Sequence, residues 1–124
     1  MSVELENIVT QMFKSLDDLD APNVVKWFAH DIQMVEEISG KWTRGKNHAE
    51  KAFTDSLQVV SDIHSKISEF YTVMTDETAL LTCLLTQTYI YQGNPVSLVA
   101  PTTVAFRREN GEWKIILLHS LPLA

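Results

Sequence analysis

The sequence contains a single cysteine, Cys83, among its 124 residues. One cysteine cannot form a disulfide within the chain, so a reducing cytoplasm is the expected location. It also cannot build a thiolate metal site, and His30, His48 and His64 have no metal-ligand spacing among themselves. We therefore expect no bound metal and a cytoplasmic protein in which Cys83 is a small core residue.

Long apolar runs are also missing. The first ten residues, MSVELENIVT, have neither a basic region nor a hydrophobic stretch, so we expect no secretory leader. No segment reaches the length that a membrane span needs.

Basic residues are scarce: 10 Lys and Arg stand against 16 Asp and Glu, which gives a net charge of -6. This balance argues against binding to nucleic-acid backbones and to anionic membrane surfaces. The sequence has no phosphate-binding loop, dinucleotide fingerprint or nucleophile elbow, so we expect no cofactor. Its length and its 45% hydrophobic content fit one ordinary globular domain, residues 1–124.

The first half of the chain has helical spacing of its apolar residues. Residues 3–19 place one apolar stripe along a helix. Asp20 and Pro22 are typical of the cap and first turn of a short second helix, which would bury Phe28. The further elements expected here are a strand at 32–37, a turn with a short returning strand at 39–45, and a third helix at 46–60.

The second half alternates with a period of two, which predicts long strands. Turns are expected at Asp76, at the QGNP of 92–95 and at the ENG of 109–111. Three helices followed by an antiparallel meander make an α+β fold, whose sheet would curl around the helices and leave a cavity. The predicted strands are 62–74, 78–91, 96–108 and 113–120.

The strand at 78–91 has no charged residue on either face. A face that meets water normally carries charges, so we expect both faces to be covered. Helices would cover one face, and a second copy of the chain would cover the other. The alternative is a threonine-rich face that simply meets water.

The last two predicted strands carry a series of motifs in a fixed order. They are a Thr-x-Val-x-x-Arg-Arg run, a Gly-x-Trp turn and a histidine six residues after that tryptophan: Thr102, Val104, Arg107, Arg108, Gly111, Trp113 and His119. This half of the chain resembles NTF2-like domains, above all the SnoaL-like group and the association domain of calcium/calmodulin-dependent kinase II. The helices and the glycine at position 45 fit as well, so the resemblance spans the whole chain.

The resemblance implies a cone-shaped α+β barrel, with three N-terminal helices packed on a curved, mostly antiparallel sheet. It also implies a homodimer through the convex sheet face and a pocket inside the cone. Ketosteroid isomerases, limonene epoxide hydrolases, scytalone dehydratases and polyketide cyclases use that pocket for catalysis, whereas other members only bind or assemble. The fold therefore does not decide the function.

Glu36 is the first candidate for catalysis. In an extended strand Ile32, Met34 and Glu36 share one face, which would point the carboxylate into the cone. Burial among apolar groups would raise its pKa and suit a general acid or base near neutral pH. Glu36 also matches the catalytic aspartate position of ketosteroid isomerases. The alternative is an exposed acid at a strand end, next to Glu37.

His119 is the second candidate. Simple alternation puts it on one face with Trp113, Ile115 and Leu117, and it matches the last histidine of the family's final strand. A neutral imidazole there could polarise a ligand or pair with Glu36. The alternatives are a buried histidine that is satisfied by a backbone carbonyl and one at the dimer interface.

Other inward-facing side chains would bind the ligand. Tyr89 and Gln87 share a face with Leu85 and could hydrogen-bond the ligand, although Gln87 is more typical of the core or rim. Thr103 is expected to face inward beside Tyr89 on the paired strand. The aromatic members would wall the pocket or serve as plain core. The predicted ligand-binding set is Met12, Trp27, Met34, Trp42, Phe53, Leu85, Tyr89, Thr103 and Leu117.

The sequence departs from two relatives in ways that bear on the ligand. Met12 stands where ketosteroid isomerases carry an oxyanion-binding tyrosine, so steroid isomerisation by that mechanism is not expected. Leu85 and Thr103 stand where the kinase association domain carries pocket arginines. The resemblance therefore points to a small, uncharged, apolar ligand.

Three functions follow from this sequence. The first is a small-molecule pocket that performs cofactor-free isomerisation, dehydration, cyclisation or hydrolysis, with Glu36 and His119 as acid and base. The second is a binding module without catalysis. The third is a dimerisation or assembly domain with a residual cavity.

Overall fold

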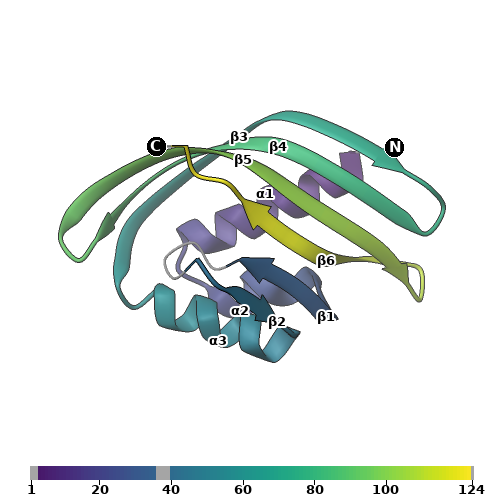
Figure 1. Ribbon diagram of the computed structural model, residues 1–124, viewed down its shortest axis with the longest axis horizontal. Coiled ribbons are helices and arrows are strands. Elements are labelled where there is room, and N and C mark those ends of the chain that lie inside the picture. Colours follow the sequence, from purple (N-terminus) through teal and green to yellow (C-terminus); the bar gives the residue numbers. More distant parts are fainter. Residues whose placement is uncertain (1–2, 36–39, 124) are drawn as a thin grey trace.

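A strongly curved sheet arches over helix α1 in the computed structural model, which describes residues 3–35 and 40–123 (Figure 1). The described strands run in the order β2-β1-β6-β5-β4-β3. Every neighbouring pair is antiparallel except β1 and β6, which are parallel. The elements are α1 (Val3–Asp17), α2 (Ala21–Val24), η1 (Val25–Trp27), β1 (Phe28–Val35), β2 (Trp42–Arg44), α3 (Lys46–Ser56), β3 (Val60–Met74), β4 (Thr78–Tyr91), β5 (Asn94–Glu109) and β6 (Glu112–Ser120).

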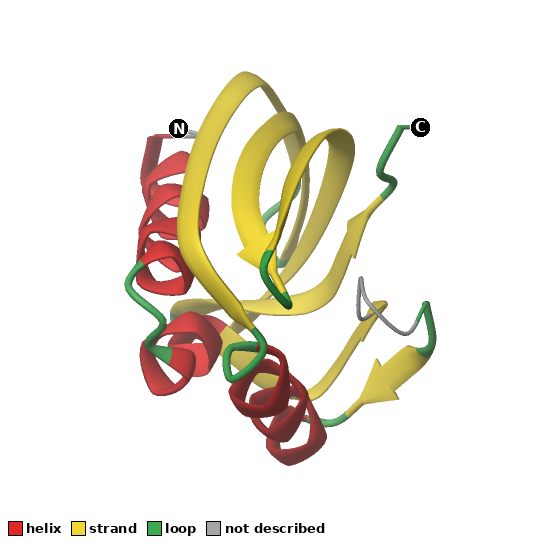
Figure 2. Cartoon of the chain, turned by 90° about the vertical axis from the view of Figure 1, so that its left-hand side faces the viewer, coloured by secondary structure: helices red, strands yellow, loops and turns green. Residues whose placement is uncertain are grey.

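The α+β prediction is therefore confirmed: three helices pack against a curved, mostly antiparallel sheet. The sheet does not close on itself within the described residues, because β2 and β3 form its two edges. Figure 2 shows the long strands curling around one side, with the helices gathered on the other.

Two bulges bend the edge strand β3. Its register with β4 shifts between Ser61 and His64 and again between Ser68 and Tyr71. Asp62, at the first shift, has a φ of 57°, and the same left-handed geometry recurs at the second shift. A bulge bends its strand and increases the local twist, so β3 can wrap around α1.

The hairpin at the end of β5 has a two-residue turn. Asn110 and Gly111 both have positive φ values, 51° and 80°, as a type I′ turn requires. This turn matches the right-handed twist of its strands, so the expectation of a hairpin at 109–111 is confirmed.

Helix α1 buries the apolar stripe that the sequence predicted. Its inward residues pack against the concave face of the sheet, and the helix ends at Asp17, two residues before the predicted end. Asp20 then caps α2 as expected, since its carboxylate accepts a hydrogen bond from the backbone N–H of Asn23 at 3.3 Å. The buried stripe is Leu5, Ile8, Val9, Met12 and Phe13.

Two further predicted boundaries are wrong because strand pairing overrides local propensity. Strand β1 begins at Phe28, which was expected in the second helix, because Phe28 pairs with Ile115 of β6. Helix α3 stops at Ser56 instead of reaching Val60, because Val60 pairs with Tyr91 and starts β3.

The two faces of β4 differ in burial. Alternate residues, such as Leu81 and Leu85, are buried against the helices, as expected. The opposite face is exposed in this chain: Leu80 retains 47% of its accessible surface, and Thr82 and Thr86 beside it are exposed. The covering of this second face by another copy of the chain stays a prediction.

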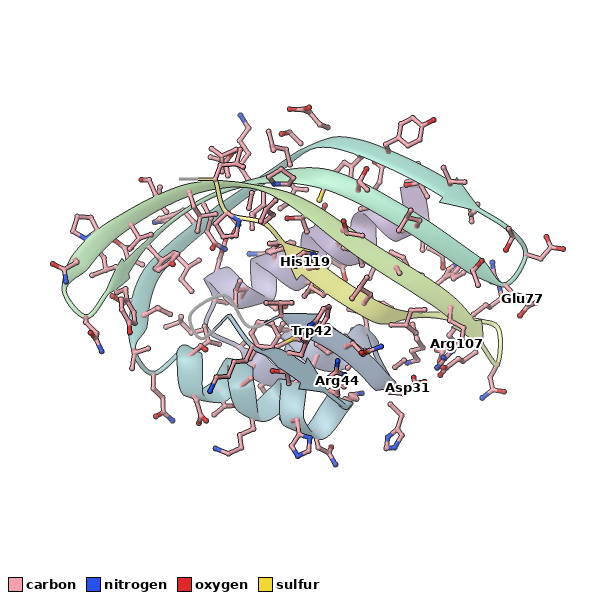
Figure 3. All side chains as sticks on the ribbon, in the orientation of Figure 1. Asp31, Trp42, Arg44, Glu77, Arg107 and His119 are labelled. Atoms are coloured by element: carbon pink, nitrogen blue, oxygen red, sulfur yellow. The ribbon has the colours of Figure 1, made fainter. Side chains whose placement is uncertain are left out.

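Arg107 ties β5 to β1 across the intervening strand β6. Its Nη2 and Nη1 atoms donate to the two carboxylate oxygens of Asp31 at 2.7 and 3.2 Å, and its Nε donates to Glu109 at 2.8 Å. Figure 3 shows Arg107 and Asp31 side by side at the same edge of the molecule. The guanidinium lowers the pKa of the Asp31 carboxyl below its usual 3.8, because the charged carboxylate accepts its hydrogen bonds.

Removing this clamp should change the acid side of the stability profile. The pKa of Asp31 is lower in the folded chain than in the unfolded chain. The ionised carboxylate therefore stabilises the fold above its ordinary pKa, and this stabilisation is lost as the pH falls through the pKa of the folded chain. We expect Arg107→Met to lower the urea midpoint slightly at neutral pH, since the pair is exposed, and to approach wild type near pH 2.

Arg108→Met is the matched control. Arg108 donates to the backbone oxygens of Asp76 and Gly111, which do not titrate, so any loss in this variant should stay constant with pH. A loss for Arg107→Met that is constant from neutral pH to about pH 2 would contradict the assignment.

Cys83 lies in the core, and its burial raises the pKa of the thiol from 9.0 to about 11. A disulfide reagent attacks the thiolate, so at about pH 8 we expect native Cys83 to react at least roughly 100-fold more slowly than in urea. Equal rates in the two states would contradict burial.

The raised pKa of Cys83 also affects stability at high pH. Because the pKa is higher in the folded chain, the unfolded thiol ionises first, and the free energy of unfolding should fall as the pH rises from 9.0 towards about 11.

Candidate functional site

A cavity of about 120 Å³ lies between α1, α3 and the concave face of the sheet. Its walls are mainly apolar, and it is partly open to solvent. An enclosed cavity of about 150 Å³ can hold a benzene molecule, so this smaller but partly open space fits a small ligand that extends towards the opening, or one part of a larger ligand. The lining residues are Met12, Phe13, Leu16, Val24, Met34, Val35, Phe53, Ser56, Leu57, Val60, Ile63, Leu85, Gln87, Tyr89, Leu118 and Ser120.

The lining side chains in the described part of the chain carry no formal charge at neutral pH. Polar groups come from Ser56, Gln87, Tyr89 and Ser120. Ser120 shares a hydrogen bond of 2.8 Å with the hydroxyl of Thr102. Such a surface suits an uncharged molecule, because an ion would lose its hydration without gaining a counter-charge.

Gln87 is the polar lining residue with the best-defined support. Only 4% of its surface is exposed, and its Nε2 donates to the Oγ of Ser65 at 2.9 Å. Ser65 in turn contacts Asp17, the last residue of α1: its Oγ lies 2.7 Å from Oδ1, and its backbone nitrogen lies 3.0 Å from Oδ2. A chain of hydrogen bonds therefore runs from the end of α1 across β3 to the cavity.

One extra residue in β6 decides which of its side chains reach the cavity. Phe106 of β5 pairs with Ile115, but the next residue back, Ala105, pairs with Leu117, so Ile116 has no partner on β5. Such a bulge reverses the alternation of the residues that follow it. Leu118 therefore lines the cavity.

His119 consequently lies on the other face of β6 from Leu118. The expectation that it shares a face with Trp113 and Ile115 is wrong, because the bulge separates them. Its ring centroid lies 6.3 Å from that of Trp42, a side chain with 51% of its surface exposed (Figure 3). Leu117 was predicted to bind ligand. It is the residue before Leu118, so its side chain lies on the opposite face of β6, the face of His119.

Trp42 belongs to a shallow groove between β2 and α3. The guanidinium carbon of Arg44 lies 5.5 Å from the centroid of the Trp42 ring, and its Nε donates to the side-chain oxygen of Gln33 at 2.9 Å. This groove is more open and more polar than the cavity. Its lining residues are Trp42, Thr43, Arg44, His48, Lys51, Ala52 and Asp55.

Thr103 was expected inside the cone beside Tyr89. The register instead pairs Tyr89 with Val96, and Thr103 with Thr82 and His119 on the outer face. Neither Thr103 nor the half-buried Trp27 is among the lining residues.

The structure does bring together five of the predicted ligand-binding residues. Glu36, the predicted acid or base, lies outside the described residues. That the five lining residues bind a ligand, and that Glu36 acts in catalysis, stay predictions. The five that line the cavity are Met12, Met34, Phe53, Leu85 and Tyr89.

Sequence reasoning missed the hydrogen bonds that support the site. Gln87 was expected more as a core or rim residue than as a ligand contact, although it lines the cavity beside Leu85. Asp17 carried a usable signal, since an acid at the C-terminal end of a helix opposes the helix dipole and calls for another partner. Ser65 carried none.

Two further observations concern residues 3–35 and 40–123 only. No three side chains of His, Cys, Asp or Glu gather there in a way that could hold a metal ion. None of the helices there has both the length and the apolar character to cross a membrane.

Solved structures with this fold are numerous but distant in sequence. A proposed calcium/calmodulin-dependent protein kinase II association domain from Xanthomonas campestris superposes with a TM-score of 0.85 at 18% identity, over 99% of this chain and 88% of that one. A proposed dehydratase of the NTF2-like family from Streptomyces avermitilis gives 0.83 at 16%, over 96% and 93%. A ketosteroid isomerase-like protein from Erwinia carotovora atroseptica gives 0.82 at 14%, also over 96% and 93%. At such identities the likeness establishes the fold alone.

Sequence comparison gives the family. No curated protein sequence matches the chain. The profile of the SnoaL-like domain, however, matches residues 5–123, which is nearly the whole chain. This protein therefore belongs to the SnoaL-like domain family, with an NTF2-like fold and an apolar cavity under its sheet.

Proposed function

We propose that this protein binds a small, uncharged and largely apolar molecule in the cavity between α1 and the sheet. The observation that carries the proposal is the lining itself: apolar side chains form most of it, none of its described members is charged, and the amide of Gln87 is held in it by a hydrogen bond to Ser65. Apolar cavities with a few placed polar groups are the usual form of small-molecule sites.

Turnover of the bound molecule is a narrower form of this proposal. Relatives described as a dehydratase and as ketosteroid isomerase-like share the fold. Glu36 follows Val35, a lining residue, and would act as acid or base in a cofactor-free reaction. His119 is the weaker candidate, because its ring lies beside Trp42 on the outer face. The main proposal is therefore ligand binding, and it does not depend on turnover.

Filling the cavity should weaken ligand binding. Leu118→Trp adds an indole side chain to the lining, whereas Leu117→Trp adds the same group to the opposite face of β6. We expect Leu118→Trp to weaken the binding of free indole at least tenfold in an NMR titration, because the added ring occupies its space.

Leu117→Trp should bind indole like wild type, and both variants should keep a cooperative thermal transition. Equal binding by the two variants would place the ligand elsewhere and overturn the proposal.

We also propose that a second copy of this chain covers the convex face of β4. Exposed Leu80 and Val99 and the uncharged side chains of Thr82 and Thr86 support this, because an uncharged, partly apolar sheet face is unusual against water. A twofold contact would bring the same face of each copy together.

Native mass spectrometry tests this covering. We expect wild type at twice the 14.1 kDa mass of the chain, and the double variant Leu80→Glu/Thr86→Glu at 14.1 kDa, because buried carboxylates would face each other. Val3→Glu, on the exposed side of α1, is the control and should stay dimeric. A wild-type monomer at micromolar concentration would contradict the covered face.

A further inference from the structure

The hydrogen bonds that lead from Asp17 to Gln87 have a fixed direction. The backbone N–H of Ser65 can only donate, so Oδ2 of Asp17 accepts from it at 3.0 Å. An ionised carboxylate has no proton to give, so the Ser65 hydroxyl donates to Oδ1 at 2.7 Å. The Ser65 oxygen then accepts from Gln87, whose amide must turn its Nε2 towards it, at 2.9 Å.

The carbonyl oxygen of Gln87 is thereby turned away from β3. Ser65 is the direct partner of Gln87 on β3, and Leu98 is its partner on β5. Leu98 is buried and its side chain offers no hydrogen-bond donor. Gln87 itself lines the cavity, and neither strand partner supplies a donor to its Oε1, so this oxygen is the group that a bound molecule would meet.

We propose that Asp17 is a positioning residue that fixes Gln87 as a hydrogen-bond acceptor in the cavity, so that at this point of the lining the site favours molecules carrying an N–H or O–H donor over those carrying only an acceptor. This inference rests on the proposed binding function. It explains why an acid stands at the C-terminal end of α1, where the helix dipole disfavours it. A ligand without a donor would leave the Gln87 oxygen unsatisfied, which typically costs about tenfold in affinity.

Asp17→Asn should reverse this polarity. The Ser65 backbone N–H stays a donor, so it takes the amide oxygen of the new side chain and leaves the new NH2 group facing the Ser65 hydroxyl. That hydroxyl then accepts from the new NH2 group and is free to donate its own hydrogen to Gln87, an arrangement that favours Oε1 at this position. We expect the amide of Gln87 to flip and present Nε2 to the cavity.

The test compares two probes of nearly equal shape. Indole carries an N–H donor, and benzofuran carries a ring oxygen in its place. In NMR titrations we expect wild type to prefer indole about tenfold, and Asp17→Asn to lose or invert that preference. Ser65→Ala should bring the ratio towards one, because the amide of Gln87 is then free to adopt either orientation.

Asp18→Asn is the matched control. It removes the same charge one residue later, from an exposed side chain 3.7 Å from Lys14. It should keep the wild-type ratio of indole affinity to benzofuran affinity. This result would show that the hydrogen-bond direction, and not the loss of a charge, sets the preference. If both probes bind and Asp17→Asn keeps the same preference as Asp18→Asn, the inference is wrong.

A second measurement needs no ligand. The side-chain NH2 hydrogens of Gln87 should show nuclear Overhauser effects to Ser65 in wild type and to cavity residues such as Leu118 in Asp17→Asn. If neither probe binds but these effects move as described, the binding function fails and the positioning role stands. If the effects stay on Ser65 in the variant, the positioning role fails.

Discussion

A single extra residue in β6 is the constraint on which the site depends. Strand β6 lies between β5 and β1, so its side chains form a wall of the concave space on one side and the outer surface on the other. The bulge at Ile116 exchanges these sides halfway along the strand. Leu118 is thereby placed against the cavity, and His119 is placed beside Trp42. The site consequently has an apolar wall where simple alternation would give it an imidazole.

The same cavity depends on the bent edge strand at the far side of the sheet. Bulges in β3 let it curve around α1, and the end of α1 then meets Ser65 through Asp17. The contact stabilises the helix end against the sheet and holds the amide of Gln87 in one orientation. Packing and ligand selectivity are linked in this way, because the residue that anchors the helix also orients the polar group in the cavity.

Much of this architecture could be predicted from local patterns. The apolar stripe of α1, the Asn110-Gly111 turn and the two faces of β4 follow from periodicity and turn chemistry. The bulge could not, since Ile115 to Leu118 are all apolar and alternation within them carries no information. The start of β1 and the end of α3 also depend on partners far along the chain, which a local pattern does not contain.

A crystal structure determined under xenon pressure would test the central claim most directly. Xenon enters small apolar cavities, so its electron density marks the space that a ligand would use. The account predicts a xenon atom between Leu85 and Leu118, with β6 bulged at Ile116 and the ring of His119 outside. An empty space there, with the imidazole of His119 turned into it, would contradict the account.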